Sequence, residues 1–328
     1  MDSNYKYMVC TQCMTYNQKP FIEETLRGFT MQQIPFPVVT VVTDDASTDG
    51  EQELLRMWVA ENLDLTAADA CERDADYAHI ISAPLKGNPL HTFVFLFLKE
   101  NHYSQKKTKQ PYLAEWMDCS KYYAFCEGDD YWTEPLKLQQ QVDFLENDPT
   151  VSFTCHRFKV FDQELDTWET DGHEKKFKDF PDGFRFSASQ NQGWLTKTLT
   201  MVCRADAVEG CRQMGRWFDY IMVYFLLKSG DGYIFNACWG VYRKHGGGVR
   251  SKNSKLENAR RMYRATGLLY EFDPNPTTRR IYYNSYATLF AVTKGGILFQ
   301  EKFELRKFLS IGVSYLKKLY RLLLNKRK

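Results

Sequence analysis

The fold of this chain is decided by the stretch Tyr122-Tyr123-Ala124-Phe125-Cys126-Glu127-Gly128-Asp129-Asp130-Tyr131-Trp132. Residues 122–126 alternate aromatic and small side chains, which is typical of a short buried strand. Three acids follow at once, and the glycine between them allows a tight turn. Ligands of open α/β sheets bind at the carboxyl ends of the strands. The stretch therefore predicts a central strand that ends in a binding site.

The three acids are Glu127, Asp129 and Asp130. Neighbouring carboxylates raise one another's pKa unless a cation joins them. Oxygen ligands of this kind suit Mg²⁺ or Mn²⁺, with a phosphate completing the coordination shell. The alternative is an acidic surface turn that only caps a helix beginning near Pro135.

Two further strand ends carry polar residues. A strand over 8–14 ends at Thr15-Tyr16-Asn17, and a strand over 38–43 ends at Asp44-Asp45-Ala46-Ser47-Thr48-Asp49-Gly50. Each is followed by helical spacing, so the chain opens with βαβ units. An Asp pair after a strand can be a simple helix cap. Three such ends along one edge of a parallel sheet favour a shared site instead.

The remaining pattern continues the alternation of strands and helices. We expect strands over 79–83, 151–161, 191–203 and 233–242, and helices over 20–29, 113–121, 136–145, 205–214 and 221–228. The segment 64–76 reads as a loop-helix insertion, and 162–182 as a surface loop. The fold class expected is α/β, a mostly parallel central sheet flanked by helices, with a domain over 1–250.

Two stretches near the end of this domain could carry chemistry. Asp219 begins a helix among aromatic residues, where it could be an N-cap or a partly desolvated general base. The loop Arg243-Lys244-His245-Gly246-Gly247-Gly248 is basic and rich in glycine, as a diphosphate site requires. A plain flexible turn is the alternative for this loop.

Composition limits the classes of function. The 328 residues are 44% hydrophobic and the net charge is +2, so a large core is possible and no nucleic-acid partner is expected. Nine cysteines without regular spacing, and no signal peptide, indicate reduced thiols in a cytoplasmic protein. No apolar run has the roughly 18–20 residues needed to cross a bilayer.

The segment 251–328 is expected to be a helical extension. Its end is amphipathic, and residues 301–328 hold nine Lys/Arg against two Glu, a net charge of about +7. Such a helix could lie on the inner face of an anionic membrane, on its own domain or on a partner. The pattern does not separate these three cases.

In their order and spacing, these motifs resemble those of the family 2 glycosyltransferases of the GT-A (Rossmann-like) fold, over roughly residues 5 to 250. The motifs that carry the resemblance are Thr15-Tyr16-Asn17, Asp44-Asp45-Ala46-Ser47-Thr48-Asp49, Glu127-Gly128-Asp129-Asp130, Phe218-Asp219 and Tyr242-Arg243-Lys244-His245. The resemblance implies an inverting hexosyltransferase for polysaccharide biosynthesis. It would use a nucleotide-diphosphate sugar, with a UDP-sugar favoured, a divalent metal (Mn²⁺ or Mg²⁺), and a glycan or lipid-linked acceptor.

The resemblance also implies roles for the matching residues. On the nucleotide side, base and ribose would be contacted by Thr15, Tyr16, Asn17, Asp44, Asp45 and Asn101. Around the diphosphate and donor sugar it implies Asp129 with Glu127 as metal ligands, Asp130 at the sugar, Asp219 as catalytic base, and Arg243, Lys244 and His245 at the diphosphate. Glu127 replaces the family's usual Asp, and the alternative to ligation for it is a contact with the ribose or one mediated by water. Phe218 stands where a Glu often precedes the base.

Two other functions remain open from the residues. A nucleotidyltransferase would share the sheet edge, the carboxylates and the metal, but it normally has a glycine-rich loop after the first strand. Here that loop is Tyr16-Asn17-Gln18-Lys19-Pro20, without glycine. A non-catalytic scaffold subunit of a glycan-assembly complex would leave the acids a structural role only.

Overall fold

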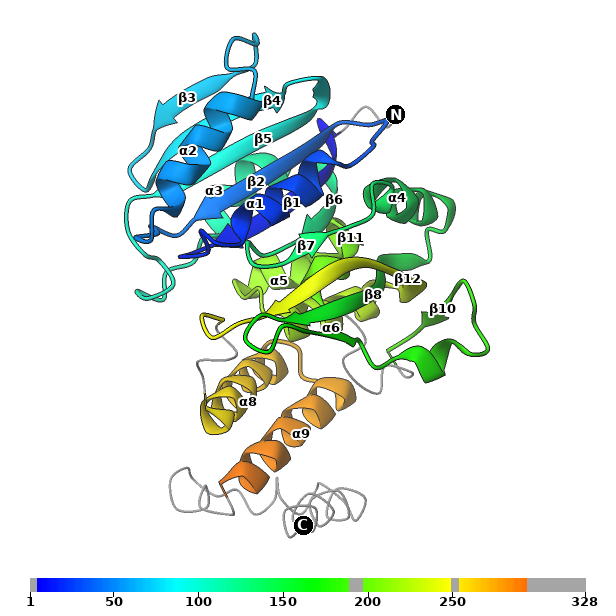
Figure 1. Ribbon diagram of the computed structural model, residues 1–328. Helices are drawn as coiled ribbons and strands as arrows, with labels where there is room; N and C mark the ends of the chain where they lie inside the picture. Colours follow the sequence, from blue (N-terminus) through cyan, green and yellow to red (C-terminus); the bar gives the residue numbers. More distant parts are fainter. Residues whose placement is uncertain (1–4, 189–196, 249–253, 294–328) are drawn as a thin grey trace. The chain divides into compact units, whose positions relative to one another are not determined.

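A computed structural model of the chain describes residues 5–188, 197–248 and 254–293 (Figure 1). One compact unit reaches to Lys244 and a second begins at His245. The elements of the first unit are β1 (Tyr7–Thr15), α1 (Ile22–Thr30), β2 (Val38–Asp44), α2 (Glu51–Asn62), β3 (Cys71–Asp74), β4 (Ala78–Leu85), β5 (Asn88–Leu98), α3 (Gln110–Met117), β6 (Ser120–Phe125), β7 (Tyr131–Trp132), α4 (Lys137–Asn147), β8 (Val151–Asp162), β9 (Thr167–Thr170), η1 (Glu174–Phe177), β10 (Gly183–Phe186), η2 (Thr198–Thr200), β11 (Val202–Arg204), η3 (Asp206–Val208), α5 (Glu209–Met214), α6 (Asp219–Ser229) and β12 (Asp231–Lys244). Those of the second are α8 (Lys255–Phe272) and α9 (Pro276–Val292).

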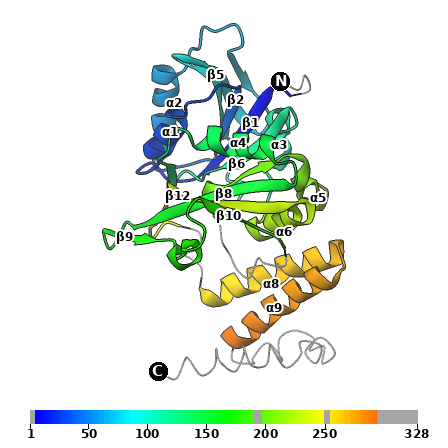
Figure 2. The same ribbon diagram turned by 90° about the vertical axis from the view of Figure 1, so that its right-hand side faces the viewer.

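The centre of the sheet is parallel. Strands β6, β1, β2 and β5 lie side by side in that order, each parallel to the next. All seven residues of β2 are buried, as expected for a strand covered on both faces. Figure 2 shows α1 and α2 on one face of this part of the sheet and α3 on the other. The predicted α/β fold class is confirmed, and the carboxyl ends of β1, β2 and β6 share one edge.

Antiparallel strands extend the sheet on both sides. On one side β4 and β3 follow β5, and on the other β11 lies antiparallel between β6 and β8. The long strand β12 runs parallel to β8 and also pairs antiparallel with the short β7, Gly240 lying opposite Trp132. Strand β12 therefore returns the chain to the loop that carries the acids.

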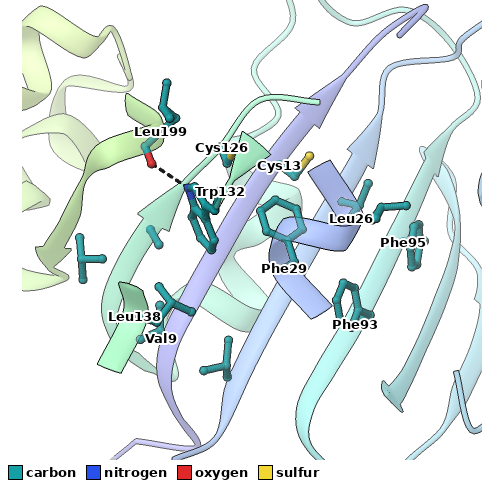
Figure 3. Packing of buried hydrophobic residues seen from close by; sticks show 14 of the residues in the cluster. Val9, Cys13, Leu26, Phe29, Phe93, Phe95, Cys126, Trp132, Leu138 and Leu199 are labelled. Atoms are coloured by element: carbon teal, nitrogen blue, oxygen red, sulfur yellow. Dashed lines mark hydrogen bonds between the residues drawn. The ribbon is translucent and has the colours of Figure 1, made fainter. Parts of the chain in front are cut away.

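Trp132 lies at the middle of the main core (Figure 3). Its ring meets that of Phe29 of α1 edge to face at 5.0 Å between centroids. Its indole N–H donates to the carbonyl oxygen of Leu199 at 2.8 Å, so the ring is buried without leaving a polar atom unsatisfied. This tryptophan fixes the acidic loop on one side to α1 and on the other to η2.

The described part of the second unit contains the two packed helices α8 and α9. Each begins with a reciprocal capping box, Ser254 with Glu257 for α8 and Asn275 with Thr278 for α9. Tyr263 and Tyr282 stack between them at 5.1 Å. The predicted domain boundary at residue 250 and the basic tail over 301–328 lie outside the described residues. None of the helices in the described part of the chain combines the length and apolar composition that crossing a bilayer requires.

Three predicted segments differ from the structure. The predicted loop-helix insertion over 64–76 is wrong, because it contains the edge strand β3, whose four side chains are all exposed and give no apolar period. The predicted surface loop over 162–182 includes β9, which forms a hairpin with β8. The described part of the predicted strand over 191–203 is the short helix η2 followed by β11, because the chain turns at Thr198 to reach the acids.

Lys137 gives a pH-dependent test of the core. It is fully buried, its ammonium lies 4.0 Å from the Trp132 ring centroid and donates to Gln141 Oε1 at 2.8 Å, and burial lowers its pKa to about 7 from 10.5. Because the unfolded chain binds this proton more strongly, the stability of the wild type rises with pH above about 7.

We therefore expect Lys137→Met to be more stable than the wild type at pH 6, by about 1–3 kcal/mol. The difference should shrink toward pH 9, as measured by urea unfolding at each pH. A difference that stays constant between pH 6 and pH 9 would show that the buried amine does not titrate there.

Candidate functional site

The backbone of the acidic loop is held at the ends of β1 and α1. The amide N–H of Cys126 donates to Gln12 O at 3.0 Å, and that of Gly128 donates to Met14 O at 3.0 Å. The hydroxyl of Thr25 contacts the carbonyl oxygens of Gly128 at 3.0 Å and Asp130 at 2.7 Å. The loop after β6 therefore continues the pairing with β1 past the end of the sheet.

Position 128 requires glycine because there is no room for a side chain, and not because of its backbone angles. It does not adopt a positive φ. A Cβ at this position would lie 2.5 Å from both Thr15 Oγ1 and Gln18 Oε1. The acidic loop and the loop after β1 thus touch through a position that has no side chain, and the predicted residues Thr15 and Glu127 come into one neighbourhood.

The acids of the loop share one electrostatic environment with Asp219. Burial, followed by the charges of Asp219 and Asp129, raises the pKa of Glu127 to about 7 from 4.5. Burial also raises the pKa of Asp130 well above its usual range, with further contributions from Asp129 and Glu127. The structure therefore brings together the four predicted acids of the site, although Asp219 is 89 positions from Asp130.

Thr198 lies in the stretch 191–203, whose alternating threonines predict a strand that lines a groove, and it is a partner of Glu127 that this prediction did not specify. Its hydroxyl lies 3.0 Å from both carboxylate oxygens of Glu127. The neighbouring Lys197 has its ammonium 4.1 Å from the centroid of the Tyr242 ring, and its charge offsets part of the rise in the pKa of Asp130. The sequence pattern did not indicate the contact of Thr198 with Glu127, because the two residues are 71 positions apart in the chain.

Arg243 anchors the acidic loop from β12. Its backbone N–H donates to Asp130 Oδ1 at 2.8 Å, and its Nε donates to Asp129 O at 3.1 Å. The guanidinium also bonds Gln163 at 2.8 Å and pairs with Glu24, and the residue is only 6% exposed. These contacts make Arg243 an internal anchor of the loop, and its predicted contact with a diphosphate stays a prediction.

The two other basic residues of this segment differ in position. The ammonium of Lys244 pairs with Glu169 of β9 at 2.7 Å, and both side chains are partly exposed. His245 is the first residue of the second unit. The roles predicted for both residues at the diphosphate remain predictions.

The loop after β2 is fixed to the loop after β1 by several short contacts. The side-chain oxygen of Asn17, a residue with φ of 54°, accepts from Thr48 N at 2.7 Å, and Asn17 N donates to Ser47 Oγ at 2.8 Å. Asp44 is buried and accepts from Ser47 N and from the side chain of Gln52. Burial raises the pKa of Asp44. Asn17 and Asp44 therefore hold the shape of this edge.

Glu51 is a second residue that the sequence patterns missed. It is fully buried at the start of α2, and it accepts from Gln18 N at 2.8 Å, from Ser47 Oγ at 2.9 Å and from the hydroxyl of Thr15. Burial raises the pKa of this carboxyl above its usual value. An acid at a helix start is ordinary, so only the fold reveals that Glu51 joins two loops of the site.

The predicted nucleotide side also has accessible surface. Tyr16 is 44% exposed, and the side chain of Asn101 accepts from Ser104 N at 2.7 Å. A recess of about 340 Å³ lies over the joined loops, and its lining is Lys19, Ser47, Thr48, Gly50 and Glu53. This edge of the sheet thus offers hydroxyls, an ammonium and an exposed aromatic ring to a ligand.

A divalent cation is compatible with the acids of this loop. Among the residues that the structure describes, no group of three or more His, Cys, Asp or Glu side chains is arranged to hold a metal. Burial, together with two neighbouring carboxylates, raises the pKa of Glu127, and a cation would relieve the repulsion between the carboxylates. Further oxygen ligands would have to come from a bound ligand or water.

Comparison with known proteins supports the fold. No family model matches the chain. It is 30% identical over 147 residues to the uncharacterized protein Rv1520 of Mycobacterium tuberculosis (strain H37Rv) and equally to Mb1547 of Mycobacterium bovis. That match covers 45% of this chain and 34% of the length of those relatives.

Two solved glycosyltransferase structures have a similar fold. Staphylococcus aureus TarS 1-349 in complex with UDP-GlcNAc gives a TM-score of 0.54 at 13% identity, over 96% of this chain and 81% of that chain. The mannosyltransferase PcManGT from Pyrobaculum calidifontis, in complex with GDP-Man and Mn²⁺, gives 0.50 at 16% identity, over 99% and 89%. At these identities the similarity establishes the fold, which agrees with the GT-A fold that the motifs predict.

We expect Gly128→Ala to separate the two loops, because its Cβ would lie 2.5 Å from Thr15 Oγ1. The strain should cost about 1–3 kcal/mol and abolish any ligand binding at this edge. Gly87→Ala is the matched control, since Gly87 has φ of +79° but nothing within 4 Å of a Cβ. That change should cost about 1 kcal/mol without affecting binding. If calorimetry shows that both variants bind a ligand at this edge with equal affinity, the close approach of residue 128 to Thr15 is unimportant for binding.

Proposed function

We propose that the chain is a glycosyltransferase of the family 2 type. It would transfer a hexose, with inversion, from a nucleotide-diphosphate sugar to a hydroxyl of a glycan or lipid-linked acceptor, and a UDP-sugar is the favoured donor. The observation that carries this proposal is the convergence of Glu127, Asp129, Asp130 and Asp219 at the sheet edge where β1 and β2 also end. The solved glycosyltransferases of similar fold include complexes with UDP-GlcNAc and with GDP-Man and Mn²⁺, which supports it.

Glu127 and Asp129 are the residues that would hold a divalent metal. When bound, Mn²⁺ or Mg²⁺ would act as a Lewis acid for the departing diphosphate. The chain itself contributes fixed positive charge, since Lys197 lies close enough to Asp130 to oppose the rise in the pKa of that carboxyl. Arg243 holds Asp129 and Asp130 from β12, so the acids keep their positions as charge develops.

Asp219 is the proposed general base. It is the first residue of α6, and its charge raises the pKa of Glu127. In a single displacement, the acceptor oxygen forms a bond to the anomeric carbon while the bond from that carbon to the diphosphate oxygen breaks. The diphosphate leaves with the electron pair, and the acceptor proton passes to Asp219. Inversion follows, because no enzyme nucleophile takes part.

The wider role that we propose is polysaccharide or lipid-linked glycan assembly in the cytoplasm, at the inner face of the membrane. Its support is the basic composition of residues 301–328, which lie outside the described residues. The nucleotidyltransferase alternative has less support, because the loop after β1 carries no glycine. A scaffold would need no acid with a raised pKa beside other carboxylates, whereas such clusters are common at functional sites.

A thermal-shift panel tests nucleotide use. We expect UDP with Mn²⁺ to raise the melting temperature, since a ligand that binds only the native state stabilises it. At a concentration of 100 times Kd the gain is about 2.7 kcal/mol. GDP and CDP with Mn²⁺, and UDP with EDTA, complete the panel. No shift with any nucleotide and metal would favour the scaffold alternative.

Asp219→Asn separates binding from chemistry. The variant should bind UDP with Mn²⁺ normally but lose about 10²–10⁴-fold in transfer rate, because a general base contributes that much. Asp143→Asn, at an exposed position of α4, is the control and should retain full activity. Near-normal transfer by Asp219→Asn, followed as UDP release from a UDP-sugar on which the wild type is active, would exclude Asp219 as the base.

A further inference from the structure

The carboxylate of Asp45 accepts three hydrogen bonds from one loop of the same chain. Its Oδ1 accepts from the backbone N–H of His102 at 2.9 Å, and its Oδ2 accepts from the N–H of Tyr103 at 3.0 Å. The ammonium of Lys109 donates to Oδ2 at 2.7 Å. Asp45 itself is tied to the first loop, since its N–H donates to Thr15 O at 3.0 Å. One side chain thus joins β1, β2 and the loop that follows β5.

The geometry leaves little of this carboxylate to a ligand. Its side chain is 2% exposed, and that of Lys109 is 17% exposed. A buried charge with a nearby cation and two amide donors is a stable arrangement, and removing one donor is costly. A base that bound directly to Asp45 would have to reach a carboxylate that is almost completely buried and already accepts from three donors. The contacts therefore describe a structural clamp rather than an acceptor that awaits a nucleotide.

The loop has a second anchor on the far side of the clamp. The ring of His102 is buried, with Nδ1 3.0 Å from Glu100 O and Nε2 3.2 Å from the hydroxyl of Tyr112. Tyr112 in turn stacks on Tyr77 at 3.8 Å between centroids. Between these anchors Tyr103 is 54% exposed. The loop is therefore held at both ends while it presents an aromatic ring at the edge where β1 and β2 end.

We propose that Asp45 is a positioning residue, which with Lys109 fixes the loop over 101–109 as one wall of the nucleotide-base site. The base is then contacted by the loop, through Tyr103 and Asn101, and by Tyr16 of the first loop. This assignment rests on the proposed function, because it specifies how that site selects a nucleotide. It differs from the direct hydrogen bond to the base that the sequence motif implies for Asp45.

The test combines a measurement without nucleotide and one with it. Hydrogen exchange of the peptide covering 99–110 is followed in the ligand-free protein, and the Kd values for UDP and GDP with Mn²⁺ are measured by calorimetry. The variants are Asp45→Asn and Lys109→Met. Lys107→Met is the matched control, since Lys107 pairs with Glu100 in the same loop and its side chain is 47% exposed.

The clamp predicts parallel effects of the two variants. Both should speed amide exchange at His102 and Tyr103 by roughly tenfold or more, because each removes a charged hydrogen-bond partner. Both should weaken binding of the preferred nucleotide by a similar factor and reduce the ratio of the UDP and GDP affinities. A loss of global stability alone would not change that ratio. Lys107→Met should change neither measurement.

Two results would overturn the assignment in different ways. If Asp45→Asn abolishes UDP binding while exchange is unchanged and Lys109→Met binds normally, Asp45 contacts the base directly and the clamp is wrong. If the wild type binds neither UDP nor GDP with Mn²⁺, the proposed function fails and the role in selecting a base fails with it. The exchange measurement requires no nucleotide, so it still shows whether Asp45 and Lys109 hold the loop when the proposed function fails.

Discussion

The site depends on the close approach of two strand ends, which is possible only because residue 128 has no side chain. The amide of Gly128 bonds to Met14, and a Cβ there would meet Thr15 at 2.5 Å. This contact places Glu127 and its neighbouring acids directly beside the loop after β1. Parallel pairing of β1 with both β2 and β6 makes the approach possible, because it aligns the three carboxyl ends. The acids are thus positioned by backbone geometry before any side chain contributes.

Placing several carboxylates in such a restricted volume has an electrostatic cost, and the surrounding residues show how it is reduced. Burial, followed by the charges of the neighbouring carboxylates, raises the pKa of Glu127 and of Asp130, so each holds its proton at higher pH than an exposed acid. Hydrogen bonds from Thr198 to Glu127 and from Arg243 N to Asp130 act in the opposite direction. The balance leaves a neighbourhood that favours a bound cation, which is the property that a diphosphate-sugar enzyme requires.

The sequence could predict the parts of this molecule whose signal is local. The strands β1 and β2 are apolar runs that end in polar residues, so their existence and the shared edge followed directly. Strand β3 could not be predicted, because its exposed side chains carry no period, and its stability comes from pairing with β4. The contact of Lys109 with Asp45 joins residues 64 positions apart, and the contact of Thr198 with Glu127 joins residues 71 apart. Such pairs depend on how the strands are ordered in the sheet, which no local pattern contains.

The same distinction explains why motif residues can be located correctly and still have a task that the motif does not indicate. Arg243 and Asp45 both stand at the sheet edge where the motifs place them, yet both use their polar atoms within the protein. Arg243 bonds the backbone of Asp129, and Asp45 bonds the backbone of His102 and Tyr103. A loop that ends in a ligand site has many backbone groups to satisfy, and buried charged side chains are the strongest available partners. Charged residues at such an edge therefore divide into those that shape the loops and those that meet the ligand, and burial together with bonding partners separates the two groups.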